Sequence, residues 1–356
     1  MQKTDSMVRG TEGFDNYIKK QMKKDRKFWI DAIKAICMIC VYVYHTGYYY
    51  GIDYNKFVFI FTPFYVNGFF FISGYLFFKS YDKKHLYGKK EYIKSIKNIL
   101  FRLVIPTIFF SACLYIPKHW GAIIIDGFII NTLGGTGFWF TSAMCVSQIV
   151  LATFFLSNRK NIWIYFLFAT TILATMNIFG DIRSKPAEEY FPWYWQTGLI
   201  YIFVMCLGGI YYKYEESVYK LISKPFMVLL ITVAYAVIIY YSLIYPTYYF
   251  SLSGRNNMLG IIGMVISILL LISITTRIKE SRLLHYIGKN SIVFYFLSGA
   301  VPTAVSVITN SLIEEKSYII YTCVTIVSLA VSCGITYIIT HYMPFILDLR
   351  NIWNTK

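Results

Sequence analysis

Three ionisable residues, Asp31, Lys34 and His45, lie in one long apolar segment, residues 28–50. Ionisable groups inside a membrane span are unfavourable and usually functional. In a helix, the eleven-residue step from Lys34 to His45 returns both side chains to nearly one face, about 16 Å apart along the axis. Asp31, three residues before Lys34, shares that face. The pattern favours a reaction path through a bilayer. The plainer alternative is that His45 and Lys34 merely reach the two interfaces.

Composition places the chain among polytopic membrane proteins. Of its 356 residues, 57% are hydrophobic, 19% aromatic and only 15% charged, which argues against a soluble domain of this length. The first apolar segment has full spanning length and no Ala-x-Ala-like site, so we expect it to be retained as a signal anchor. Nearly all seven cysteines fall in apolar segments, and the Cys37 and Cys40 pair has no second pair, so we expect no metal site.

The apolar runs predict an all-α bundle of about ten transmembrane helices. The expected spans are residues 28–50, 57–78, 99–117, 138–157, 161–180, 194–212, 225–245, 257–276, 291–310 and 318–341. The piece 121–133 is apolar but too short to cross, and glycines follow it, so we expect a re-entrant or interfacial segment.

The distribution of lysine and arginine predicts the orientation. With the N-terminus inside, 27 of these residues fall on the cytoplasmic side and six on the other. Both termini are therefore expected in the cytoplasm. Residues 1–27 would form a basic cytoplasmic segment, 28–342 the transmembrane domain and 343–356 a cytoplasmic tail. The net charge of +16 then reflects topology and anionic lipid, and nucleic-acid binding is not expected.

Polar residues in the second expected span suit close helix packing. Asn67 can hydrogen-bond to a neighbouring helix, and Ser73 with Gly74 permits close approach. Such features are also common where a span has no function beyond packing.

Two further segments carry candidate residues at the cytoplasmic side. Lys97 and Arg102 belong to a basic stretch that could hold phosphates, although positive-inside anchoring is the preferred explanation for most of its lysines. The segment 284–295 contains a cytoplasmic turn in which Asn290 or Ser291 is expected to cap the ninth span.

In this order, these segments resemble the acyltransferase family 3 integral-membrane proteins over roughly residues 26–342. The family pattern has Asp-x-x-Arg/Lys and then His in the first span, a Phe-Phe-x-x-Ser-Gly block, a basic stretch ending in Arg-x-x-x-Pro, a Trp-Phe pair and a Gly-Lys-Asn-Ser block. The matching residues here are Asp31, Lys34, His45, Phe70 to Phe77, Arg102, Pro106, Trp139, Phe140 and Gly288 to Ser291. The chain departs from it in having Lys34 where many relatives have Arg, and Ser298 where relatives often have His.

The resemblance implies a multi-pass cell-membrane O-acyltransferase. Such an enzyme would move an acyl group, commonly acetyl, from cytoplasmic acyl-CoA to a hydroxyl of a surface glycan or lipid-linked sugar. His45 would act as general base or transient acyl carrier, and Lys34, Arg102 and Lys97 would hold the CoA phosphates. Asp31 would orient Lys34. The supporting residues would be Asn67, Ser73, Trp139, Asn290 and Ser291.

Two other functions fit the residues without acyl transfer. A transporter or flippase for a lipid-linked glycan could line its pathway with His45 and Lys34. A glycan polymerase or ligase fits less well, because no long outer loop is expected. Acyl-CoA that copurifies with the protein would separate the transferase from both.

Overall fold

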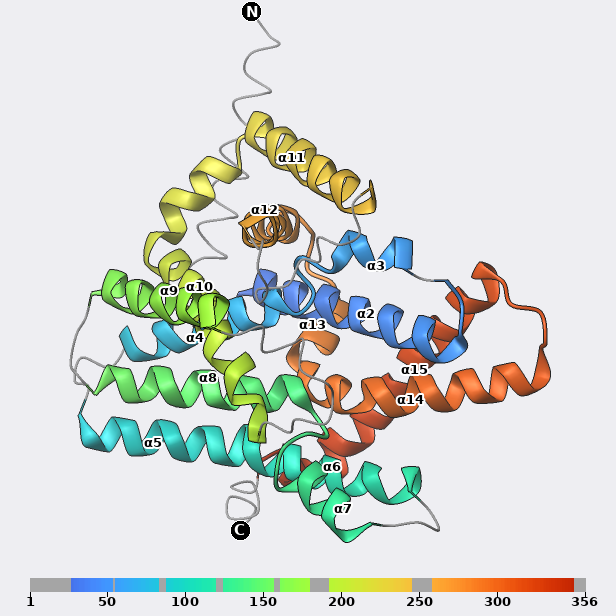
Figure 1. Cartoon of the computed structure of the whole chain (residues 1–356). Coiled ribbons are helices and arrows are strands. Elements are labelled where there is room, and N and C mark those ends of the chain that lie inside the picture. Colours follow the sequence, from blue (N-terminus) through green and yellow to red (C-terminus); the bar gives the residue numbers. More distant parts are fainter. Residues whose placement is uncertain are drawn as a thin grey trace, which may run out of the picture.

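The computed structural model describes residues 27–53, 55–82, 88–119, 124–156, 161–179, 192–244 and 258–348. Within these ranges every regular element is a helix, and the helices form one bundle (Figure 1). Their bounds are α2 (Phe28–Tyr50), α3 (Asn55–Phe61), α4 (Asn67–Asp82), α5 (Lys89–Ile99), η1 (Leu100–Val104), α6 (Ile105–Lys118), α7 (Ile125–Thr132), α8 (Trp139–Phe155), α9 (Ile162–Phe179), η2 (Pro192–Tyr194), α10 (Trp195–Ile222), α11 (Pro225–Ile244), α12 (Met258–Thr275), α13 (Arg282–Lys289), α14 (Ser291–Leu312), α15 (Tyr318–Tyr342) and α16 (Pro344–Leu347). Residues 1–26 of the expected N-terminal segment and 349–356 of the expected tail lie outside the described ranges.

Six helices in the described ranges are long and apolar enough to cross a membrane. They are Phe28–Tyr50, Lys89–Ile116, Pro192–Ile222, Pro225–Ile244, Ser291–Leu312 and Tyr318–Tyr342. Three shorter apolar helices cover Trp139–Phe155, Ile162–Met176 and Leu259–Thr275. The all-α, multi-span class is therefore confirmed, whereas the count of ten spans and the orientation of the termini stay predictions.

The prediction of one continuous helix over residues 57–78 is wrong. Helix α3 ends at Phe61, a turn follows, and α4 begins at Asn67. Pro63 lies in this turn, and its ring disfavours a helical conformation at Thr62 while removing a backbone donor. The break lets α4 start beside Cys37, in the middle of α2.

The expected third span, 99–117, begins too late. The helix starts at Lys89 and continues through the wide π turn η1 into α6. Pro106 follows that turn and provides its cause, because proline lacks the N–H for an i−4 hydrogen bond and its ring clashes with the carbonyl one turn earlier.

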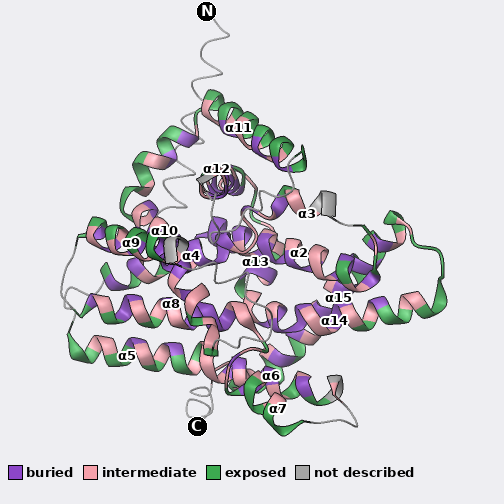
Figure 2. Ribbon diagram, viewed as in Figure 1, coloured by how far each residue is buried: buried purple, intermediate pink, exposed green. Residues whose placement is uncertain are grey.

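Helix α2 runs through the interior of the bundle and contacts α4, α12, α13, α14 and α15 (Figure 1). Its first two turns are almost entirely buried. At its other end the Lys316 ammonium donates to the carbonyl of Tyr50 at 2.8 Å. A cation there also complements the helix dipole. By contrast, α11 lies at the edge and is mostly exposed and apolar, as expected for a helix facing lipid (Figure 2).

The expected re-entrant piece, 121–133, holds one short helix, α7, within its described part. The turn after it is fastened by Trp193, whose backbone N–H and indole N–H donate to Gly134 and Leu133 at 2.8 and 3.0 Å. Trp193 and Tyr194 both have positive φ. The indole N–H of Trp193 is therefore occupied by a hydrogen bond within the protein.

Candidate functional site

The Asp31 carboxylate joins two helices at the N-terminal end of α2. One oxygen lies 3.5 Å from the Lys34 ammonium, on the same helix, and the other lies 2.9 Å from Nδ1 of His285 on α13. The Asp31 side chain is only 2% exposed, whereas those of Lys34 and His285 are 18% and 47% exposed. A buried carboxylate thus holds two basic groups that remain accessible.

Helix α13 reaches this site because Gly288 rests directly on the backbone of Asp31. A Cβ at Gly288 would overlap the Asp31 carbonyl, so no other residue permits the same approach. Tyr286 fixes α13 from its other side by donating to the Cys333 carbonyl of α15 at 3.0 Å. The glycine of the Gly-Lys-Asn-Ser block is therefore a packing residue at the site.

Asn290 lies between α13 and α14, at the position expected for the cap of the ninth span. Its side-chain amide donates to the Tyr286 carbonyl at 3.0 Å, and makes no cap hydrogen bond to α14. Asn290 is therefore the N-cap of α14 by position, as expected, but its side chain closes α13 and does not bond to the first turn of α14. Ser291 is the first residue of α14 and is half-buried.

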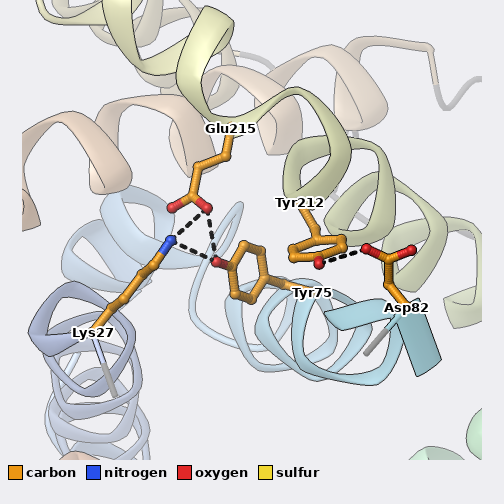
Figure 3. A network of polar contacts seen from close by, with 5 residues as sticks. All are labelled: Lys27, Tyr75, Asp82, Tyr212 and Glu215. Atoms are coloured by element: carbon orange, nitrogen blue, oxygen red, sulfur yellow. Dashed lines mark hydrogen bonds and ion pairs between the residues drawn. The ribbon is translucent and has the colours of Figure 1, made fainter. Parts of the chain in front are cut away.

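A second ion pair lies one turn before Asp31 (Figure 3). Lys27 bonds to Glu215 of α10 at 2.6 Å and to the hydroxyl of Tyr75 of α4 at 3.1 Å, and that hydroxyl donates to Glu215 at 2.8 Å. The side chains of Lys27 and Glu215 are only 7% and 13% exposed. This closed triangle holds α2, α4 and α10 together at the end of α2 that carries Lys34.

His45 lies three turns farther along α2 and is half-buried. Its imidazole packs edge-on against Tyr44 and stacks over Tyr49, with ring centroids 5.4 and 6.0 Å apart. Tyr44 in turn contacts Tyr65, in the turn between α3 and α4. Within the described ranges neither ring nitrogen of His45 has a hydrogen-bond partner.

Unpaired polar atoms gather along the same half of α2. The buried hydroxyls of Thr46 and Tyr50, those of Ser306 and Ser328, and the amide oxygen of Asn310 have no hydrogen-bond partner among the described residues. These residues come from α2, α14 and α15, which pack together. A buried, unpaired polar group costs about 1–3 kcal/mol, so this region suits water or a polar ligand.

Lys97 and Arg102 lie on α5 and η1, which pack against α8. Both side chains are exposed, and the Arg102 guanidinium lies 3.3 Å from the Asp348 carboxylate beyond α16. The described contacts therefore tie Arg102 to the C-terminal end of the chain, whereas Lys34 is tied to α13.

The remaining predicted residues hold helices in place. Asn67 donates to the Pro63 carbonyl at 2.8 Å and so closes the turn before α4, while its buried side-chain oxygen has no partner among the described residues. Ser73 accepts from Gln148 of α8 at 2.9 Å. Trp139 is half-buried at the start of α8 and packs against the core.

Sequence reasoning did not select His285, Lys27, Glu215 or Tyr75. His285 lies in the segment 284–295, which the sequence already marks as a candidate, and this position was the feature that could have identified it. Lys27 directly precedes α2 and lies four residues before Asp31, on the helix face that Asp31 and Lys34 share, but its basic neighbours assign it to the N-terminal segment. Nothing in the sequence alone pairs it with Glu215, 188 residues away.

No three His, Cys, Asp or Glu side chains in the described ranges gather as a metal site. No curated protein and no solved structure is significantly similar to the chain. A family model described as an acyltransferase domain matches residues 27–337, nearly the whole chain and all the helices that bear the site. The chain therefore belongs to acyltransferase family 3, a family of membrane acyltransferases.

Proposed function

We propose that this protein is a cell-membrane O-acyltransferase that moves an acyl group, acetyl in the first instance, from cytoplasmic acyl-CoA to a hydroxyl of a surface or lipid-linked glycan. The family supports acyl transfer. The main support for the proposed donor and acceptor sites is the unbroken helix α2, which bears the cationic Lys34 at one end and the imidazole of His45 near the other. Their helical offset, about 16 Å, is comparable to the reach of a pantetheine arm.

The donor would bind at the Lys34 end of α2. CoA phosphates are anionic, and the Lys34 ammonium beside Asp31 offers charge-assisted donors from a partly exposed position. Arg102 and Lys97 are exposed cations on the same basic segment of the chain, and we assign them to phosphates that extend outward. The thioester would then point along α2 toward His45.

At His45 the reaction can follow two balanced routes. As general base, the imidazole takes the proton of the acceptor hydroxyl while its oxygen attacks the thioester carbon, the C–S bond breaks and CoA leaves as the thiol after taking a proton. As nucleophile, the unprotonated ring nitrogen attacks the thioester carbon, the C–S bond breaks and CoA leaves as the thiolate. The acceptor oxygen then attacks the acyl carbon, the C–N bond to the imidazole breaks, and the hydroxyl proton passes to the CoA thiolate. Both routes need a ring nitrogen with an available lone pair, and among the described residues neither nitrogen of His45 has a hydrogen-bond partner.

Two measurements together test this proposal. The purified full-length protein should bind acetyl-CoA, and the native host should lose an O-acyl ester from its surface glycan when the protein is deleted. A transporter would instead change the amount of glycan at the surface and leave the ester content of each chain unaltered. Normal ester content after deletion would contradict the proposal.

A further inference from the structure

Helix α13 supplies a basic group to the site from the far end of the sequence. Nδ1 of His285 lies 2.9 Å from Asp31, whereas the Lys34 ammonium lies 3.5 Å from the other oxygen of the same carboxylate. The shorter contact therefore comes from α13. Asp31 and His285 are separated by 254 positions, so this pairing exists only in the folded bundle.

The position of His285 follows from packing that does not involve its own side chain. Gly288 lies against the Asp31 backbone, and Tyr286 is bonded to the Cys333 carbonyl. The Ser281 hydroxyl caps the start of α13 by accepting from the Leu284 N–H. The helix would thus remain docked if the imidazole were removed, and the His285 contact is available for a separate role.

That role concerns the direction of the Asp31 carboxylate. A carboxylate turns about its last bond unless both oxygens are held, and a buried one must keep its partners because desolvation is otherwise uncompensated. With His285 on one oxygen, the second oxygen is fixed toward Lys34. Lys34 has a long, flexible side chain, so this contact restricts the conformations of its ammonium before a phosphate binds.

We propose that His285 is a positioning residue of the donor site, acting through Asp31 on Lys34. The inference rests on the proposed function, since it assumes that Lys34 binds the phosphates of acyl-CoA. His285 itself needs no contact with the donor. It preorganises the ammonium, and its removal weakens donor binding only while Asp31 is present to transmit the effect.

The test is acetyl-CoA binding to purified full-length variants. His285→Ala should raise the dissociation constant about fivefold to tenfold, which lies within the range of coupling between contacting residues. In an Asp31→Asn background the same change should have less than a twofold effect. His285→Asn should stay within twofold of wild type, because its amide N–H lies close to the position of Nδ1, whereas His285→Gln places the amide too far out and should behave like alanine.

A control variant separates positioning from general stability. His341→Gln changes an exposed histidine of α15 whose contacts among the described residues lie within its own turn. This variant should bind acetyl-CoA like wild type. If His285→Ala does not fold, the comparison of His285→Asn with His285→Gln carries the test, and equal affinity of these two variants would overturn the inference.

Lys34→Ala distinguishes failure of the inference from failure of the proposed function. Unchanged acetyl-CoA binding in Lys34→Ala would remove the donor site from this end of α2 and the inference with it. Weakened binding in Lys34→Ala together with wild-type binding in His285→Ala would contradict the positioning role alone.

Discussion

At the scale of single residues, the site depends on how a few charges are buried. Asp31 is inside the bundle and is held by partners on two helices, while Lys34 and His285 keep an accessible side. Lys27 is also buried, but its ammonium is already paired with the Glu215 carboxylate. Of Lys27 and Lys34, therefore, Lys34 is the better suited to a mobile anionic ligand.

Donor binding should depend on Lys34. Loss of one charge-assisted contact corresponds to about 1.5–3 kcal/mol, so Lys34→Ala should weaken acetyl-CoA binding roughly tenfold to a hundredfold. Lys34→Arg should be much milder, because it keeps the charge and adds a planar fork. Arg102→Ala should weaken binding less than Lys34→Ala, since its side chain is exposed and already paired with Asp348. Isothermal titration of the purified variants checks this, and unchanged affinity in both alanine variants would move the donor site elsewhere.

Stability should depend on Lys27 and Glu215. Glu215→Gln leaves the Lys27 ammonium buried without its counter-charge, which is expected to destabilise the protein by about 3–5 kcal/mol. The double variant with Lys27→Met should be less unstable than the sum of the single changes. Glu216→Gln is the matched control, because its ion pair with Lys220 is exposed and worth about 0–1 kcal/mol. Apparent melting temperatures in detergent give the comparison, and equal losses for Glu215→Gln and Glu216→Gln would refute it.

At the scale of elements, the site depends on close helix contacts made by glycine. Gly288 brings α13 onto α2, and Gly74 brings α4 onto the backbone of α10 at Met205. The second contact keeps Tyr75 beside Glu215. Small residues in membrane helices have this effect because they let backbones approach.

Gly74→Ala should separate α4 from α10. A Cβ there would overlap the Met205 carbonyl, which belongs to rigid backbone, so a loss of about 1–3 kcal/mol or more is expected. Gly299→Ala in α14 is the control, since nothing lies within 4 Å of its added Cβ. It should be neutral or stabilising by up to about 1 kcal/mol through helix propensity. The two variants can be compared by folded yield and melting temperature, and equal stability would argue against the tight α4–α10 contact.

Local patterns in the sequence predict some elements well and others poorly. The bounds of α2 agree with the expected span because the apolar run ends at Gly51 and polar residues follow. The break at Pro63 and the π turn before Pro106 were missed because hydropathy averages over single prolines. In the site, Asp31 with Lys34 is a local i, i+3 pair and was predictable, whereas His285 and Glu215 reach α2 only through tertiary packing.

At the scale of the whole molecule, the account depends on which end of α2 faces the cytoplasm. With a cytoplasmic acyl-CoA donor, as proposed, the account requires the Lys34 end to be inside and the His45 end to be outside. The bias of 27 to six in lysine and arginine supports that orientation. The turn between α14 and α15, which contains Glu315, would then be outside, and α5 would be inside.

Cysteine labelling tests this orientation. In a background without the seven native cysteines, Glu315→Cys should react with an impermeant maleimide in intact cells, and Lys94→Cys only after permeabilisation. Both side chains are exposed, so lack of reaction would reflect the membrane and not burial. The opposite pattern would place Lys34 on the outer side and remove the route from cytoplasmic donor to outer acceptor.

The most direct measurement of the central claim is the ester content of the surface glycan in a deletion strain complemented with His45 variants at matched expression. General-base or nucleophilic catalysis by a positioned histidine is worth about 10² to 10⁴ in rate, so His45→Ala should restore essentially no ester. His45→Gln should fail nearly as badly, because an amide cannot take the proton, and both purified variants should still bind acetyl-CoA. Wild-type ester content with His45→Ala would contradict the account, since acyl transfer would then not pass through this residue.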